Sequence, residues 1–164
     1  MSKAQSAMEF LMTYGWAILI MLTVIAILFY LGVFSPATVS PNACVLPAGF
    51  SCHGYKVTSG SGDDGRLCLI LLQTTGHTIN ITKMACSDQE NPAPVDIHRR
   101  LYNGETLEMS QLTCLKADGS PPGVGDYYRG TLYINYTDET TNIDHQISGE
   151  IAYKVEQQIG PCFP

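Results

Sequence analysis

The chain has 164 residues, a hydrophobic fraction of 45%, a charged fraction of 15% and a formal net charge of −6. The charged fraction is well below the ~25% usual for soluble domains, and the length fits one domain with an appendage. A negative chain without a basic stripe cannot neutralise a phosphate backbone, which argues against a nucleic-acid partner.

One uninterrupted apolar run dominates the N-terminal part of the sequence. Between Phe10 and Phe34 there is neither a charged residue nor a proline, and large apolar residues occur on every side of a helical wheel. At ~1.5 Å per residue, a helix of this length spans the ~30 Å hydrocarbon layer of a bilayer. Aromatic residues near both ends are typical of membrane interfaces. The run therefore predicts a transmembrane helix, and a buried helix of a soluble core is the alternative.

The distribution of basic residues predicts the orientation of this helix. Lys3 precedes the run, and no lysine or arginine follows it until Lys56. The positive-inside rule then places the N-terminus in the cytoplasm and the remainder of the chain outside. Residues 35–43 contain two prolines and no apolar period, so we expect a neck linker there.

All six cysteines lie beyond the apolar run, in the part predicted to be extracellular. None forms a Cys-x-x-Cys pair, which argues against a zinc ribbon or a thioredoxin-like site. An even number in an exported domain predicts up to three disulfides, with six buried thiols as the alternative. The favoured pairs are Cys44–Cys52, which closes a short loop, Cys86–Cys114, each near the end of a predicted strand, and Cys68–Cys162, by elimination; other connectivities stay open.

Beyond the linker, short strand-like runs are separated by stretches of glycine, proline and aspartate. Residues 67–73 are continuously apolar, which predicts a strand buried on both faces. Other runs alternate, so that Ile79 and Ile81, for example, share one face. The remaining strand candidates are residues 77–84, 106–115, 131–137 and 150–156.

Several short strands with turn punctuation and no second helical period predict an antiparallel sandwich. The predicted fold class is therefore α+β: one long N-terminal hydrophobic helix, residues 5–34, followed by an antiparallel β-sandwich domain, residues 44–164. Two asparagines on polar strand faces, Asn80 and Asn135, match the N-x-S/T pattern and are candidate glycosylation sites.

No motif in the sequence predicts catalysis. The four histidines are scattered, and the sequence contains no nucleophile elbow, zinc-protease motif or phosphate-binding loop. Residues 62–65, Gly-Asp-Asp-Gly, lack the alternating oxygen ligands and distal glutamate of a calcium loop, so a polar turn is expected. We therefore predict a protein that is not an enzyme and that uses no metal or cofactor.

The N-terminal sequence "KAQSAMEFLMTYGWAILI" resembles the class III signal peptide of archaeal type IV pilins. In that family a membrane-embedded aspartic peptidase cuts before the glutamine, on the cytoplasmic side of the apolar run. Carried onto this chain, the cut falls between Ala4 and Gln5, and residues 1–4 become a leader peptide. Glu9 is then the fifth mature residue, where type IV pilins carry an acid. Glycine commonly precedes the cut, and Ala4 departs from that pattern.

The resemblance implies an assembly role for Glu9. Cleavage creates an α-amino group at Gln5, and in a dry bundle of helices this amine and the Glu9 carboxylate of the same or a neighbouring copy offset each other's desolvation. Such a pair favours axial register, as polar residues do in coiled coils. The alternative is that Glu9 lies among lipid headgroups and caps the first helical turn.

The resemblance also implies a function. The chain would be inserted in the membrane as a precursor and would then join a homopolymeric, extracellular filament that serves adhesion. Its partners would be a prepilin peptidase, a membrane assembly platform and an assembly ATPase. One alternative is a membrane-tethered extracellular module that binds a sugar or another ligand and does not polymerise. Another is an archaellin, the subunit of a rotating filament.

Overall fold

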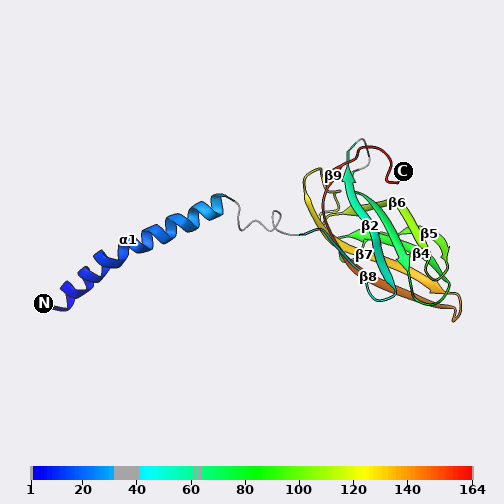
Figure 1. The fold of residues 1–164 in the computed structure, drawn as a ribbon, viewed down its shortest axis with the longest axis horizontal. Coiled ribbons are helices and arrows are strands. Elements are labelled where there is room, and N and C mark those ends of the chain that lie inside the picture. The colour runs from blue at the N-terminus through cyan, green and yellow to red at the C-terminus, as the bar shows by residue number, and fades with distance from the viewer. Residues whose placement is uncertain (1, 32–40, 61, 63, 164) are drawn as a thin grey trace. The chain divides into compact units, whose positions relative to one another are not determined.

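The computed structural model describes residues 2–31, 41–60, 62 and 64–163, and the chain divides into two compact units. The first unit, Met1–Ser40, contains helix α1 (Ser2–Tyr30), and the second, Pro41–Pro164, contains the strands (Figure 1). Most of the predicted neck linker lies outside the described residues.

Helix α1 is built from residues that favour a helix. It is rich in leucine, alanine and methionine, has no proline, and contains one glycine, Gly15, which costs about 1 kcal/mol relative to alanine. The Leu31 N–H donates to the Ile27 carbonyl at 2.9 Å, which continues the helical pattern at the C-terminal end. Side chains are described for Glu9, Met12 and residues 14–31. Counted over the described residues, no helix is both long enough and apolar enough to cross a membrane.

In the described part of the second unit, nine strands form one sheet. The longest are β7 and β8, which form a hairpin that pairs from Tyr127–Lys154 to Asp138–Ile143. The strands are β1 (Ala43–Val45), β2 (Phe50–Ser59), β3 (Arg66–Gln73), β4 (Ile79–Ser87), β5 (Val95–Leu101), β6 (Thr106–Leu115), β7 (Tyr127–Asp138), β8 (Ile143–Lys154) and β9 (Glu156–Gln157).

The strand order is β1-β8-β7-β4-β6-β3-β2-β9, and β5 pairs with β4 beside this path. Most neighbours are antiparallel. The exceptions are β2 with β9 and β4 with β6, which are parallel and each pair over two residues. The β4–β6 pairing is the junction between two larger antiparallel halves, β8-β7-β4 and β6-β3-β2.

The predicted fold class is wrong. The protein is mostly β, and its strands form a single sheet that curls into a half-barrel instead of two separate sheets of a sandwich (Figure 1). A long membrane-length helix in front of the domain, the other half of the prediction, is likewise not found among the described residues. The sandwich prediction failed because alternation shows which residues share a face but not which strands are neighbours. The connection between the halves depends on two register pairs, Cys86 with Cys114 and Ser87 with Leu115.

One apolar core fills the inner face of the curled sheet. Leu67, Leu69 and Leu71 of β3 are completely buried, and so are Ile79 and Ile81 of β4, as their shared face predicted. The strand at residues 67–73 is not equally buried on both sides, because Ile70 and Leu72 on the second side are only partly covered. The core is continuous across the β4–β6 junction, since both halves of the sheet contribute to one cluster.

Tyr128 packs against the same junction. Its side chain is 2% exposed, its hydroxyl donates to the Leu115 carbonyl at 3.3 Å, and the same oxygen lies 3.5 Å from Cys86 Sγ. Burial, with a smaller contribution from the charge of Asp88, raises the pKa of Tyr128. A Cβ atom at Gly130 would overlap the Tyr128 ring, so this position of β7 has to be glycine.

Asp138 organises the turn between β7 and β8. One of its carboxylate oxygens contacts His77 Nδ1 at 2.7 Å, and the other accepts the N–H groups of Thr140 and Thr141 at 2.7 and 3.2 Å. The hydrogen bond from His77, followed by the two backbone hydrogen bonds, lowers the pKa of Asp138 to about 2. The carboxylate therefore links the segment before β4, which contains His77, to the turn that follows β7.

We expect an Asp138→Asn variant to unfold at a lower temperature than the wild type at neutral pH. Because the folded pKa is depressed, this carboxylate contributes stability above its unfolded pKa of ~3.9, and that contribution is lost as the pH falls towards about 2. The difference between variant and wild type should therefore shrink across that window. Thermal melts over this pH range measure it. Asp96→Asn is the control, because Asp96 and Lys83 form an exposed ion pair at 3.6 Å. Equal midpoints at neutral pH would contradict the prediction.

Candidate functional site

The described side chains of α1 present apolar surface in every direction. Residues 18–21, Ile-Leu-Ile-Met, are each more than half exposed, and four consecutive residues cover a full helical turn. Trp16 and Phe29, nearer the two ends, are 63% and 66% exposed. Extended apolar surface of this kind marks a site of contact with other molecules. This surface of α1 is the first candidate site.

Glu9 lies on α1 and is exposed. The helix begins at Ser2 and has no acidic residue in its first turn, so in the uncut chain Glu9 is not a cap of that turn. Ala4 and Gln5, the residues of the predicted cleavage, also fall within the helical backbone, and their side chains lie outside the described residues. The cleavage and the assembly role of Glu9 stay predictions.

The six cysteines form three disulfides, which confirms that prediction, and the pairs are those that the sequence favoured. The Cα atoms of Cys86 and Cys114 are 4.5 Å apart, and both side chains are buried at the β4–β6 junction. Cys44 of β1 joins Cys52 of β2. Because β1 and β2 stand near opposite ends of the strand order, this bridge spans the open side of the half-barrel.

The third disulfide holds the C-terminal segment. Cys68, buried in β3, is joined to Cys162, and their Cα atoms are 5.5 Å apart. Between β9 and Cys162 the chain has little cover, and Ile159 is 91% exposed. The three bridges thus act at three different places: the junction, the opening and the tail.

Both predicted glycosylation sites lie on the outer face of the sheet. Asn80 in β4 and Asn135 in β7 are partly exposed, and each follows a buried residue of the inner face, Ile79 or Ile134. Glycosylation of either asparagine stays a prediction. Asn135 differs from Asn80 in one respect, because it lines two adjoining cavities.

The histidines do not come together. His77 contacts Asp138, and His145 stacks on Tyr136 with ring centroids 5.2 Å apart. Among the described residues there is no group of three histidine, cysteine or acidic side chains placed to hold a metal ion. In the predicted polar turn, Asp64 accepts hydrogen bonds from the Ser59 hydroxyl and the Gly60 N–H, as a turn residue does.

Comparison with known proteins gives no relative: no family model matches the chain, and no curated protein matches it.

Proposed function

We propose that the protein is a structural subunit of an archaeal type IV pilus, which polymerises through α1 into an extracellular adhesive filament. The observation that carries this proposal is the apolar surface of α1, which is exposed on all sides in a single chain. It supports polymerisation because α1 helices of many copies, packed side by side, would bury that surface in a common core. The similarity of the N-terminal sequence to pilin signal peptides supports the same function.

Polymerisation would move many apolar side chains of α1 from water into contact with other helices. Burying one Leu, Ile, Phe or Met side chain contributes ~1.5–3 kcal/mol relative to leaving it exposed. Residues 18–21 alone supply four such side chains on different sides of the helix. One partner could bury the apolar surface of a helix that is apolar on one face. To bury the apolar surface of α1, neighbours are needed around its whole circumference. A helical polymer provides such neighbours.

The second unit suits the exposed position that a filament subunit would give it. Its three disulfides are of the kind that persists outside the cell, and they hold the junction, the opening and the tail of a curled sheet. In this proposal a prepilin peptidase removes residues 1–4, and a membrane platform with its ATPase adds subunits to the filament.

A second candidate function is a surface-tethered binding module that never polymerises. The polar cavities beside Asn135 favour it, because an outer sheet face with hydrogen-bonding side chains is suited to ligand capture. The two candidates differ in whether the protein is recovered in filaments, and the following experiment separates them.

We expect the protein in sheared surface filaments to begin at Gln5. Only a cut after Ala4 makes Glu9 the fifth residue and leaves the apolar helix intact. Electron microscopy of sheared filaments, with N-terminal peptide mapping of their subunits, tests this. A mature protein that starts at Met1 or beyond Phe34 would contradict the pilin proposal. Filaments that lack this chain would favour the tethered module.

A further inference from the structure

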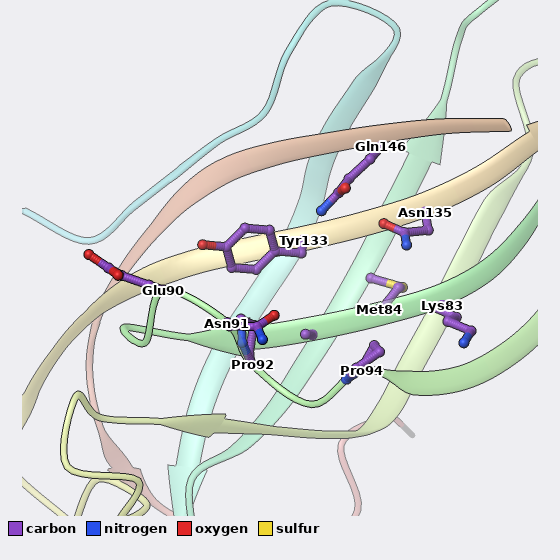
Figure 2. A pocket seen from close by; sticks show the side chains of 10 residues that line it. Lys83, Met84, Glu90, Asn91, Pro92, Pro94, Tyr133, Asn135 and Gln146 are labelled. Carbon is purple, nitrogen blue, oxygen red and sulfur yellow. The ribbon is translucent and has the colours of Figure 1, made fainter.

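Two cavities adjoin on the outer face of β4, β7 and β8. Their volumes are about 200 and 360 Å³, and they share Lys83, Asn135 and Gln146, so they form one continuous depression. The loop that follows β4 makes the wall of the first cavity, with Pro92 and Pro94 facing the strands (Figure 2). We call this depression the polar groove, and its principal side chains are Lys83, Glu90, Asn91, Tyr133, Asn135 and Gln146.

The middle of this sheet face differs from its two ends. At one end Arg129 pairs with Glu150 at 3.1 Å, and at the other the Thr137 hydroxyl donates to Asp144. Between these pairs, several polar side chains have no hydrogen-bond partner in the described part of the chain. The side chains of Tyr133, Asn135 and Gln146, and that of Asn91 on the loop, make no hydrogen bond to another described residue.

These open groups face a common space. Figure 2 shows the Tyr133 ring lying over β7, with Asn135 further along the same strand and Gln146 extending towards both from β8. Asn91 and Glu90 come from the loop on the other side. Tyr133 and Asn135 are partly buried, which lowers the number of water molecules that can form hydrogen bonds with their side chains. Hydrogen-bonding groups that converge on a cavity without protein partners indicate a ligand.

The chemistry of the groove selects the class of ligand. Three side-chain amides offer both donors and acceptors, as the hydroxyl groups of a sugar require, and the Tyr133 ring offers an apolar surface for the C–H face of a sugar ring. Lys83 forms an ion pair with Asp96 at 3.6 Å, and the other charged groups of the groove, Glu90 and Asp144, are carboxylates, so the groove has no excess of positive charge to attract an anion. The proline residues restrict the loop, which reduces the ordering cost of binding.

We propose that the polar groove is a binding site for a neutral oligosaccharide. Tyr133 forms the platform under one sugar ring, and Asn91, Asn135 and Gln146 bind its hydroxyl groups. The second cavity, towards Asp144 and His145, accommodates the next sugar residue. This inference deepens the proposed adhesive function, on which its biological meaning rests, by naming the class of ligand.

Binding is tested with the full chain, kept soluble in a detergent without a sugar headgroup. The probes are maltotriose, cellotriose, mannotriose and chitotriose, and the readout is calorimetric titration. We expect saturable binding of at least one trisaccharide. Tyr133→Ala and Asn135→Ala should each weaken it by about tenfold or more, because each removes a principal contact. Tyr102→Ala and Asn80→Ala are the matched controls, since Tyr102 is 58% exposed and Asn80 is a partly exposed strand residue, both outside the groove.

Several results would overturn the proposal. They are no saturable binding of any trisaccharide at its solubility limit, equal binding by groove and control variants, or tighter binding of trigalacturonate than of every neutral probe. A glycan covalently attached to Asn135, detected in the intact mass, would also overturn it, because the groove would then hold the protein's own modification. Sugar binding and filament formation are tested separately. A subunit that binds sugar but forms no filament would support the binding site in the groove and contradict the pilus proposal. Filaments whose subunits bind no sugar give the reverse outcome.

Discussion

A Glu9→Gln variant should be cleaved normally and yet fail to form filaments. Glutamine keeps the size and helix propensity of the side chain and removes its charge. If the carboxylate pairs with the amine of a mature N-terminus, the substitution leaves that amine without its partner in a dry bundle, which costs about 3–5 kcal/mol for each subunit. The comparison is between processed protein in the membrane fraction and filament protein in the sheared fraction, where we expect a loss of about tenfold or more.

The control for this experiment is Glu108→Gln, which removes the same charge from an exposed position on β6. That variant should form filaments as the wild type does. If Glu9 contributes only through the helix dipole, its loss costs below ~1 kcal/mol and filaments should still appear. A normal filament yield from fully processed Glu9→Gln protein would therefore refute the pairing, while the proposed filament function could stand.

Replacing both Cys86 and Cys114 by alanine should be the most destabilising of the three disulfide removals. This bridge closes a separation of 28 residues, for which the chain-entropy relation gives about 3–4 kcal/mol. Both sulfur atoms are also buried in the core, at the junction where β4 and β6 pair over two residues. We expect Tm to fall by roughly 10–15 °C. Thermal melts of the three double-alanine variants give the order.

If chain entropy alone decided the order, removal of Cys68–Cys162 would be the most destabilising, because its separation of 94 residues gives the largest entropy change in the unfolded chain. Cutting that bridge also frees the exposed C-terminal segment in the folded protein, which offsets part of the loss. Removal of Cys44–Cys52, with a separation of 8, should cost about 2–3 kcal/mol. If the variant without Cys68–Cys162 has the lowest Tm, the prediction that the Cys86–Cys114 bridge contributes most to stability is wrong.

The sequence predicted most strands whose buried residues alternate or form a continuous apolar run. The prediction at 106–115 coincides with β6, and those at 67–73 and 131–137 fall within β3 and β7. It missed β2, whose burial does not alternate although Val57 is completely buried. Strands without that signal were missed. In β5 most side chains are exposed, and the first half of β8 is almost fully exposed and held by its pairing with β7. Backbone pairing of this kind leaves no hydrophobic period in the sequence.

The polar groove was beyond prediction for a related reason. Tyr133 and Asn135 are two residues apart in the alternating run 131–137, so the sequence alone places them on one face of a strand. Gln146 belongs to the part of β8 that showed no strand pattern, and Asn91 belongs to a loop. Their convergence depends on the register of Asn135 opposite Gln146, which only the folded hairpin sets. The N-x-S/T pattern drew attention to Asn135, but for a different chemistry.

The margins of the curled sheet have a consequence for a protein whose copies are crowded together. An open strand edge is a template for pairing with the next copy. Here β1 and β9 are only three and two residues long. The third margin, β5, carries Asp96, Arg99 and Arg100 and is bent by a register shift near His98, whose φ of 50° interrupts the extended backbone. Uncontrolled sheet-to-sheet aggregation is thereby discouraged, and ordered association is left to surfaces other than the strand edges.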